Sequence, residues 1–268
     1  MLTRSKLAAD LAALGLAAGD LVMVHASLRA VGEIAGGPDE VHLAIKDVIT
    51  HRGTMFMYAS CPAYVDEVGR GNLTPAEEAE VLETLPAFDP HTARSARDNG
   101  ALVEMFRTYP GSHVNEHVAR FVVWGEHADH LLTPQPWDYA FGHWSLLERF
   151  VELDGKILLL GSDHDNVTFL HYAEHIANIP DKRIARFKVP VLENGVRVWR
   201  EVAEVDTSSQ GAHASWPDRF FAMLVDGYLA ATVNCGGRVG GAESFLFSAR
   251  GLLEHALPEM EATAARGR

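Results

Sequence analysis

The chain has 268 residues, of which 47% are hydrophobic, so it is long enough to bury a large core. Its formal net charge of −13 argues against a nucleic-acid partner, because phosphate binding needs clustered lysine and arginine, and favours a cationic ligand instead. Cys61 and Cys235 are too few for a disulfide framework or a structural zinc site. The N-terminal segment, interrupted by Asp10, lacks the pattern of a signal peptide, and no stretch reaches the roughly 18 apolar residues of a spanning helix. We therefore expect a soluble, cytoplasmic protein without a membrane partner.

The hydrophobic pattern predicts alternating helices and strands in the first part of the chain. Residues 3–16 carry apolar side chains at helical spacing, and residues 21–25 form a short apolar run typical of a buried strand. The helical pattern returns over 39–50, and a second buried strand is expected at 54–60. Strand, crossover helix and strand at this spacing indicate a parallel β-α-β unit.

Capping and apolar patterns predict further elements in the middle of the chain. Thr74-Pro75-Ala76-Glu77 has the form of a capping box with proline at the first helical position, so a short helix begins there. Strands are expected at 121–125 and 156–161, the second followed closely by a helix over 166–178.

The segment 185–203 contains the strongest turn signal. Apolar and polar residues alternate on both sides of Asn194-Gly195. Both central positions of a type I′ hairpin turn need positive φ, which asparagine and glycine adopt most readily. Two helices, over 216–233 and 243–264, are expected to end the chain. With no internal repeat or long linker, the pattern predicts a single α/β domain over residues 1–268, with the hairpin as an antiparallel addition.

Residues 161–177 carry the side chains best suited to catalysis. The segment begins at the end of an expected strand, where ligands bind in open α/β sheets, and enters a helix. His171 and Glu174 are three positions apart and share a helix face. A carboxylate beside an imidazole fixes its tautomer and stabilises the imidazolium, as a general base requires. Acyl transfer to an amine needs such a base, because an ammonium ion has no lone pair. The same spacing also fits a histidine packed there for structural reasons.

A zinc-dependent hydrolase is an alternative hypothesis. His171-Tyr172-Ala173-Glu174-His175 matches H-x-x-E-H, in which two histidines bind Zn²⁺ and the glutamate activates water, and Glu243 lies far enough downstream to be a third ligand. Residues 113–117 match as well, but they run directly into a strand-like segment, so we do not expect their two histidines to share a helix face. Two matches in a chain with 14 histidines show how easily the pattern arises.

The turn after the first strand has features of a phosphate site. Ser27 can cap a following helical turn and leave backbone N–H groups free for a phosphate, and Arg29 can add a charge-assisted contact. The chain contains neither a P-loop nor a G-x-S-x-G nucleophile elbow. The glycine-rich stretch 235–241 follows an expected helix rather than a strand, so it does not match a dinucleotide fingerprint.

Six segments in chain order resemble the aminoglycoside 3-N-acetyltransferase family. They are GLAAGDLVMVHASLRAVGEIAGGP (15–38), GTMFMYAS (53–60), PAFDP (86–90), KILLLG with DNVTFLHYAE (156–161 and 165–174), NGVRVW (194–199) and GRVGGAESFLF (237–247). The resemblance covers nearly the whole chain, and six blocks in order are highly specific. It implies a three-layer α/β fold with a central, mostly parallel or mixed sheet between helices, distinct from the GCN5-related acetyltransferases.

The resemblance also implies a reaction and its residues. The implied activity is acetyl-CoA-dependent acetylation of the 3-amino group of an aminoglycoside, which confers antibiotic resistance, with His171 as catalytic base, Glu174 orienting it and no metal. CoA would bind at two turns, formed by Ser27, Leu28, Arg29, Ala30, Val31 and Gly32 and by residues 142–145, which include Ser145. Two segments depart from the family pattern: many members have Arg-Ser-x-His-Pro where this chain has residues 113–117, and Ser-Pro where it has Ser145-Leu146.

We expect direct transfer within a ternary complex. His171 takes the ammonium proton, the amine attacks the thioester, and nearby donors hold the oxyanion, with Thr168 organising that end of the site. A covalent acetyl-enzyme on Cys61 or Cys235 is the alternative mechanism, although neither lies near a recognised base in the sequence.

Carboxylates are expected to pair with the ammonium groups of the acceptor. The candidates are Asp206 and Glu204, followed by Asp66, Glu67 and Glu243. A protein that binds an aminoglycoside without acetylating it, and an acyltransferase acting on a non-antibiotic amine, are further alternatives.

Overall fold

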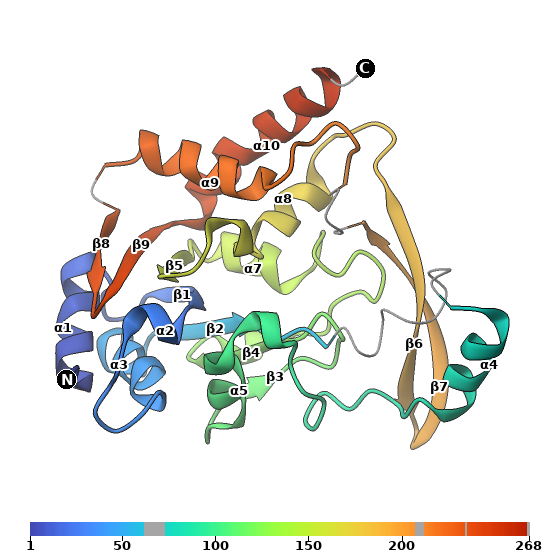
Figure 1. The fold of residues 1–268 in the computed structure, drawn as a ribbon, viewed down its shortest axis with the longest axis horizontal. Coiled ribbons are helices and arrows are strands. Elements are labelled where there is room, and N and C mark those ends of the chain that lie inside the picture. Colours follow the sequence, from blue (N-terminus) through green and yellow to red (C-terminus); the bar gives the residue numbers. More distant parts are fainter. Residues whose placement is uncertain (62–72, 207–211, 234, 267–268) are drawn as a thin grey trace.

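The computed structural model describes residues 1–61, 73–206, 212–233 and 235–266 (Figure 1). These residues form one seven-stranded mixed sheet in the order β3-β4-β2-β1-β5-β9-β8, and a separate two-stranded sheet. The strands of the large sheet are β1 (Leu21–Ala26), β2 (Thr54–Tyr58), β3 (His113–Val114), β4 (Phe121–Gly125), β5 (Lys156–Leu160), β8 (Gly236–Val239) and β9 (Ala242–Ser248). The central strands β2, β1 and β5 are parallel, and the outer pairs are antiparallel.

The predicted β-α-β unit forms the centre of the sheet. β1 pairs in parallel with β2 on one side and with β5 on the other, with Met23 opposite both Phe56 and Ile157. The short helix α2 (Leu28–Val31) follows β1 directly, and α3 (Asp39–Ile49) makes the crossover to β2. The carboxyl ends of β1, β2 and β5 therefore meet at one edge of the sheet.

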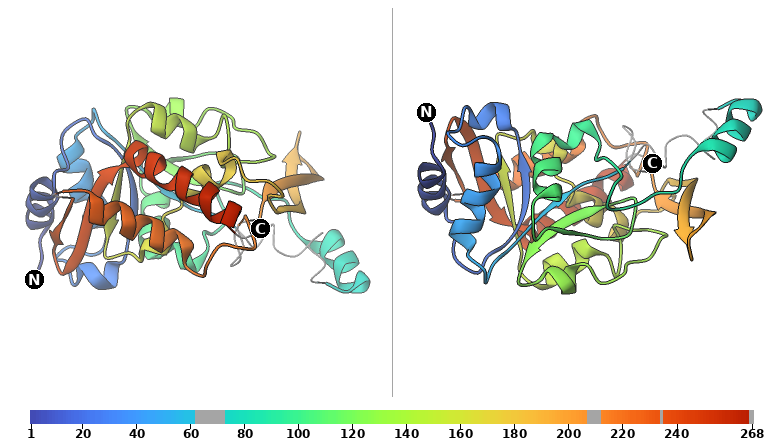
Figure 2. Two further views of the ribbon diagram at one scale, coloured as in Figure 1. Left: turned by 90° about the horizontal axis from the view of Figure 1, so that it is seen from above. Right: turned by 90° about the horizontal axis from the view of Figure 1, so that it is seen from below.

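Helices cover both faces of the sheet, which gives the expected three layers (Figure 2). Alternate side chains of β1 enter different cores: Val22 and Val24 pack with α1 (Arg4–Leu14), α3 and α5 (Ala101–Thr108), whereas Leu21 and Met23 enter the core on the other face. That second core is covered by α7 (Leu146–Glu152), α8 (Leu170–Ile176), α9 (Phe220–Ala231) and α10 (Ala249–Arg266). Both faces of the central strands are thus buried, as βαβ crossovers require. Within the described ranges, no helix is long and apolar enough to cross a membrane.

The predicted hairpin is confirmed and projects beyond the main sheet (Figure 1). Its strands are β6 (Ile184–Glu193) and β7 (Val196–Val205), joined by Asn194 and Gly195 with φ of 52° and 77°. Beside it lies α4 (Pro75–Thr84), which begins with the predicted capping box between Thr74 and Glu77. Arg197 on β7 donates hydrogen bonds to main-chain carbonyls at the end of α4, so the hairpin and this helix hold each other.

The expected helix over 243–264 is wrong at its beginning. Residues 242–248 form β9, and α10 begins only at Ala249. β9 lies between β5 and β8, and it sends Leu246 into one core and Phe247 into the other. Because the adjacent residues Leu246 and Phe247 are both buried, on opposite faces, this part of the strand lacks the alternation that marks a half-exposed strand. The remaining described elements are α6 (Ala128–Leu131) and the 3₁₀ helices η2 (Arg97–Asn99) and η3 (His164–Asn166).

Candidate active site

A cavity of about 500 Å³ lies at the carboxyl ends of the three parallel strands. The end of β1 contributes residues 25–27, the end of β2 contributes residues 57–58, and the loop after β5 contributes residues 161–163. Parallel strands end at one edge of a sheet, so these distant segments meet there. Of the catalytic and CoA-binding residues predicted from the sequence, Ser27, Thr168 and His171 line this cavity.

His171 and Glu174 form a hydrogen-bonded pair on α8. Nδ1 of His171 lies 2.9 Å from Oε2 of Glu174, which is only 1% exposed, and Oε1 of the same carboxylate accepts a hydrogen bond of 2.9 Å from the backbone N–H of Ala212. Because a carboxylate can only accept hydrogen bonds, Nδ1 carries the proton and Nε2 keeps a lone pair. The pair therefore has the geometry of a general base and its orienting carboxylate.

The surroundings of His171 restrict its ring. Phe141 and Phe221 flank it, with ring centroids 5.3 and 5.0 Å from that of the imidazole. Thr168, which also lines the cavity, accepts the backbone N–H of His171 at 3.0 Å through its carbonyl oxygen. The imidazole of His171 is thus held by packing on two sides.

The described residues that line the cavity include the carboxylates of Asp98, Asp163 and Asp165 and no lysine or arginine, although Asp163 pairs with Arg219 outside the lining at 2.5 Å. The backbone N–H of Asp165 donates to Asp163, and this hydrogen bond helps to hold the pKa of Asp163 below its ordinary value. Asp165 in turn accepts the backbone N–H of Ala222 at 3.1 Å, which ties the loop to α9. The cavity therefore suits a cationic ligand.

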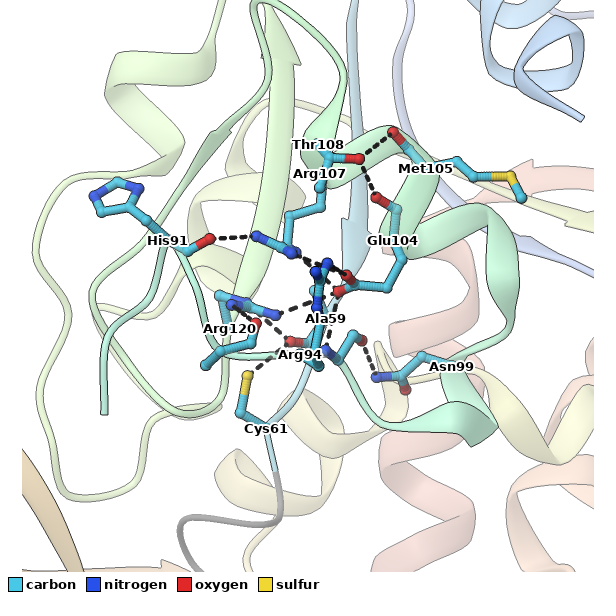
Figure 3. Close-up of polar contacts among 12 residues, drawn as sticks. Ala59, Cys61, His91, Arg94, Asn99, Glu104, Met105, Arg107, Thr108 and Arg120 are labelled. Carbon is cyan, nitrogen blue, oxygen red and sulfur yellow. Dashed lines mark hydrogen bonds and ion pairs between the residues drawn. The ribbon is translucent and has the colours of Figure 1, made fainter. Parts of the chain in front are cut away.

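A buried arginine supports the opposite rim of the cavity (Figure 3). Arg120 is fully buried and donates hydrogen bonds to the carbonyl oxygens of Ala59, Pro90 and Ala93, at 3.1, 2.6 and 2.7 Å. Since Ala59 follows β2 and the other two belong to the chain that leads to η2, the guanidinium joins this loop to the sheet.

Glu104 on α5 extends the same network (Figure 3). It accepts the backbone N–H of Ser95 at 2.9 Å and two hydrogen bonds from Arg107. Although burial opposes it, hydrogen bonding, above all from Arg107, lowers the pKa of Glu104 to about 2. Asn99 donates hydrogen bonds to the hydroxyl oxygens of Ser95 and Ser60, and these bonds hold residues 98–100 in place at the edge of the cavity.

The second histidine of the H-x-x-E-H match has other partners. Nδ1 of His175 lies 2.6 Å from the carbonyl oxygen of His171, and its Nε2 contacts the carboxylate of Glu204. Both ring nitrogens are thus engaged with protein groups, and neither is free to bind a metal. Glu243, the suggested third ligand, is exposed on β9 opposite Arg238. In the part of the chain that the structure describes, no group of three or more potential ligands could hold a metal ion.

The histidines of the other H-x-x-E-H match, at residues 113–117, have structural positions. His113 lies in β3, and His117 is buried after it, with Nε2 donating to the carbonyl oxygen of Trp137 at 3.2 Å and Nδ1 accepting the backbone N–H of Ala119 at 2.9 Å. The expectation that these histidines do not share a helix face is confirmed.

Ser27 caps α2, as predicted. Its Oγ accepts the backbone N–H of Ala30 at 3.3 Å, and Gly32, with φ of 99°, ends the helix. Gly161 allows this turn to approach the end of β5: its φ is +61°, and a Cβ there would lie 2.4 Å from Cβ of Ala30. Arg29 is exposed and Val31 is buried in the core. A close turn that carries an exposed cation therefore borders the cavity.

The sequence and the fold both match known proteins. The family model of the aminoglycoside 3-N-acetyltransferases matches residues 23–261. The chain belongs to this family. Aminoglycoside N(3)-acetyltransferase VII of Streptomyces paromomycinus is 38% identical over 275 residues, covering 99% of this chain and 94% of the relative. Aminoglycoside N(3)-acetyltransferase III of Pseudomonas aeruginosa is 36% identical over 253 residues, covering 93% and 90%.

Solved structures of aminoglycoside acetyltransferases have the same fold. AAC-IIIb in a binary complex with CoASH superposes with a TM-score of 0.90 at 39% identity, covering 97% of this chain and 96% of that one. AAC(3)-Xa gives 0.92 at 36% identity, covering 99% and 94%. AAC-VIa bound to sisomicin gives 0.89 at 34% identity, covering 97% of each chain. These matches confirm the family and the α/β fold expected from the sequence, which is not the GCN5-related one.

The second predicted CoA turn lies apart from the lining of the cavity. Ser145 is fully buried and caps α7, accepting the backbone N–H of Glu148 at 3.2 Å. The neighbouring Trp144 is 73% exposed with φ of 63°, and its backbone N–H donates to Glu148. The departure at Ser145-Leu146 leaves an intact helix cap, because Leu146 occupies the first helical position and is buried.

The acceptor-binding candidates are dispersed. Glu204 is 8% exposed and accepts the backbone N–H of Ala140 at 2.8 Å besides contacting His175. Asp206 pairs with Arg183 at 3.2 Å at the end of β7. Neither they nor Glu243 are among the described residues that line the cavity. Asp66 and Glu67 lie outside the described residues.

Several cavity residues were missed by the sequence analysis. Asp98 and Asn99 come from η2, and their only signal in the sequence is a polar run before a glycine. His25 and Tyr58 close two strands, and the position of a residue at the carboxyl end of a parallel strand is the signal that points to them.

Proposed function

We propose that the protein transfers the acetyl group of acetyl-CoA to the 3-amino group of an aminoglycoside, with His171 as general base. The observation that carries this proposal is the hydrogen-bonded pair of His171 and Glu174 in a cavity lined by carboxylates. Membership of the aminoglycoside 3-N-acetyltransferase family supports it.

The turn around α2 is the proposed site of the CoA diphosphate. A relative of the same fold binds CoASH. In this chain the Ser27 turn reaches the cavity, and the exposed Arg29 beside it offers the charge-assisted contact that a diphosphate needs. The thioester would then extend from this turn into the cavity, toward Thr168 and His171.

The acceptor is proposed to bind through the carboxylates of the cavity. A relative binds sisomicin. Asp98 and Asp165 would pair with ring ammonium groups, and Asp163, which already pairs with Arg219, would add a further acceptor oxygen. The absence of basic groups among the described lining residues favours a polycation. Asp206 and Glu243 remain predicted contacts for the more distant part of the acceptor, whereas the bonds of Glu204 give it a role in holding His175.

The reaction proceeds through proton transfer and acyl transfer. Nε2 of His171 takes a proton from the acceptor ammonium, Glu174 stabilises the resulting imidazolium, and the free amine attacks the thioester carbonyl carbon. The tetrahedral intermediate collapses with cleavage of the C–S bond, and the CoA thiolate takes up the proton from His171. Thr168 is the predicted donor near the oxyanion.

A covalent acetyl-enzyme is disfavoured by the state of Cys61. Burial raises the pKa of this thiol to about 11, so it stays protonated and weakly nucleophilic. Cys235 is also buried, and neither cysteine is among the described residues that line the cavity. Direct transfer is therefore the proposed mechanism.

The test is a thiol-release assay with acetyl-CoA and aminoglycosides that carry or lack a 3-amino group. We expect release of CoASH only with 3-amino acceptors, and its loss in His171→Ala with the fold retained. Turnover that ignores the 3-amino group would contradict the regiochemistry, and tight acceptor binding without CoASH release would favour the sequestering alternative. Near-normal turnover by His171→Ala would overturn the proposed base.

A further inference from the structure

His25 lies at the base of the cavity, on the sheet below α8. It is the second-last residue of β1, where it pairs with Leu159 of β5, two residues beyond the last pair in the register of β1 with β2, Met23 and Phe56. Along β1, His25 is in phase with Leu21 and Met23, whose side chains enter the core under α7 and α8. His25, Thr168 and His171 all line the cavity. The sheet and the helix thus present two histidines to one space.

His25 has an unsatisfied ring nitrogen. Its Nε2 is shielded from solvent and has no hydrogen-bond partner among the described residues. Buried polar atoms in folded proteins are normally paired, and an orphan beside a cavity calls for a ligand that supplies the missing partner.

The two histidines have opposite electrostatic surroundings. His171 has the carboxylate of Glu174 against Nδ1 at 2.9 Å. His25 has no carboxylate partner among the described residues, and burial lowers its pKa to about 4. At neutral pH it is therefore an uncharged ring with one N–H donor. It can donate a hydrogen bond, but it cannot serve as an acid or as a base of useful strength.

We propose that His25 donates its ring N–H to the carbonyl oxygen of the acetyl thioester and holds the oxyanion of the tetrahedral intermediate. This inference rests on the proposed acetyl transfer. His171 acts on the attacking nitrogen and His25 on the oxygen that gains charge, while the N–H bond of His25 stays intact throughout. A neutral donor placed before the reaction needs no reorganisation as the charge develops. Together with Thr168 it gives the oxyanion a donor from each wall of the cavity.

The lack of charge on His25 excludes another ligand. The uncharged ring of His25 offers no cation to the diphosphate of CoA, whereas the exposed Arg29 on the neighbouring α2 turn does. A carbonyl oxygen, which develops negative charge only in the transition state, fits a neutral donor better.

His42 provides a matched control. His42 is fully buried, whereas His25 is partly exposed, but both have a ring nitrogen with no partner among the described residues and a pKa lowered to about 4, chiefly by burial. However, His42 lies on α3, on the other side of the sheet, and does not line the cavity. His25→Phe and His42→Phe each remove one imidazole. Only His25→Phe removes a hydrogen-bond donor from the cavity in which the thioester is proposed to bind.

The test compares His25→Phe, His25→Gln and His42→Phe in steady-state kinetics. We expect kcat of His25→Phe to fall about 10²- to 10³-fold with KM for acetyl-CoA and for the acceptor within about threefold of the unchanged protein. His25→Gln keeps an N–H donor and should recover at least about tenfold of that loss. His42→Phe should keep kcat, and CoASH should bind equally to all four proteins.

A spectroscopic measurement separates this role from a structural one. Infrared spectra of bound acetyl-CoA with a ¹³C-labelled carbonyl should show a lower stretching frequency in the unchanged protein than in His25→Phe, because the hydrogen bond polarises the carbonyl. Unchanged kcat in His25→Phe, or an equal carbonyl frequency in both proteins, would overturn the inference. If the unchanged protein releases no CoASH with any acceptor, the proposed acetyl transfer fails, and this inference fails with it. If His171→Ala is inactive and His25→Phe is fully active, only the role of His25 is wrong.

Discussion

Glu174 holds His171 with one oxygen and the backbone of Ala212 with the other, each at 2.9 Å. The carboxylate therefore cannot turn away from the ring without breaking a hydrogen bond to a different part of the chain. This second bond fixes the direction of the first, and it joins α8 to the segment before α9. A histidine and glutamate three residues apart become a preoriented pair only through that contact.

Removing either member of this pair should cost most of the activity. We expect Glu174→Gln and His171→Ala each to lower kcat by about 10²- to 10⁴-fold, because the two groups act as one unit. The double variant should be little worse than His171→Ala alone. Rates of CoASH release for the three variants, with circular dichroism to monitor folding, check this. Multiplicative losses in the double variant would show that Glu174 acts independently of His171.

Gly161 should matter for CoA binding more than for stability. A Cβ at this position would lie 2.4 Å from Cβ of Ala30, so Gly161→Ala pushes α2 away from the end of β5. We expect KM for acetyl-CoA to rise on the order of tenfold, and Ala30→Gly in the same chain to restore much of it. Gly195→Ala is the matched control, since Gly195 also has positive φ but nothing within 4 Å. It should cost only about 1 kcal/mol of stability and leave KM unchanged. Equal KM values in the two single variants would contradict the proposed CoA turn.

His117 should make the protein sensitive to mild acid. Its Nδ1 accepts the backbone N–H of Ala119, and burial lowers its pKa to about 4 from the ordinary 6.5. Between these values the unfolded chain binds a proton that the folded protein refuses, so stability falls as pH decreases from 6.5 to 4. The contribution is about 3 kcal/mol over that range. Urea unfolding at several pH values should show a shallower pH dependence for His117→Gln than for the unchanged protein. Parallel curves would mean that the folded protein accommodates a charged His117.

Glu104 should stabilise the cavity rim in the opposite pH sense. Its pKa of about 2 lies below the ordinary 4.5, so its contribution is complete above pH 4.5 and is lost as pH falls through 2. Because the side chain is partly exposed and screened, we expect Glu104→Gln to cost about 2 kcal/mol at pH 7, and the difference to narrow toward pH 2. Glu254→Gln, at an exposed position on α10, serves as the control and should cost less than about 0.5 kcal/mol. A constant difference down to pH 2 would show that the charge of Glu104 is not what holds the rim.

Local sequence patterns predicted an element correctly where the interaction that defines it joins residues close together in the sequence. The capping box of Thr74 and Glu77 and the hairpin turn at Asn194-Gly195 form as predicted, because each depends on residues within one turn of the chain. The strand β9 was mistaken for the beginning of a helix, because its conformation is set by pairing with β5, more than 80 residues earlier. α5 and α7 were not predicted at all.

The sequence by itself determined the family, the order of most elements and the spacing that puts His171 and Glu174 on one helix face. Those features depend on residues that are near one another in the sequence, where helix geometry and turn conformation determine the structure. Only the tertiary structure decided which residues surround the pair. Asp98, His25 and Ala212 come from three distant segments, and they meet His171 or Glu174 because parallel strands end at one edge and a helix packs above it. The same packing engages His175 with Glu204, so the second histidine of the H-x-x-E-H match is not available to a metal ion.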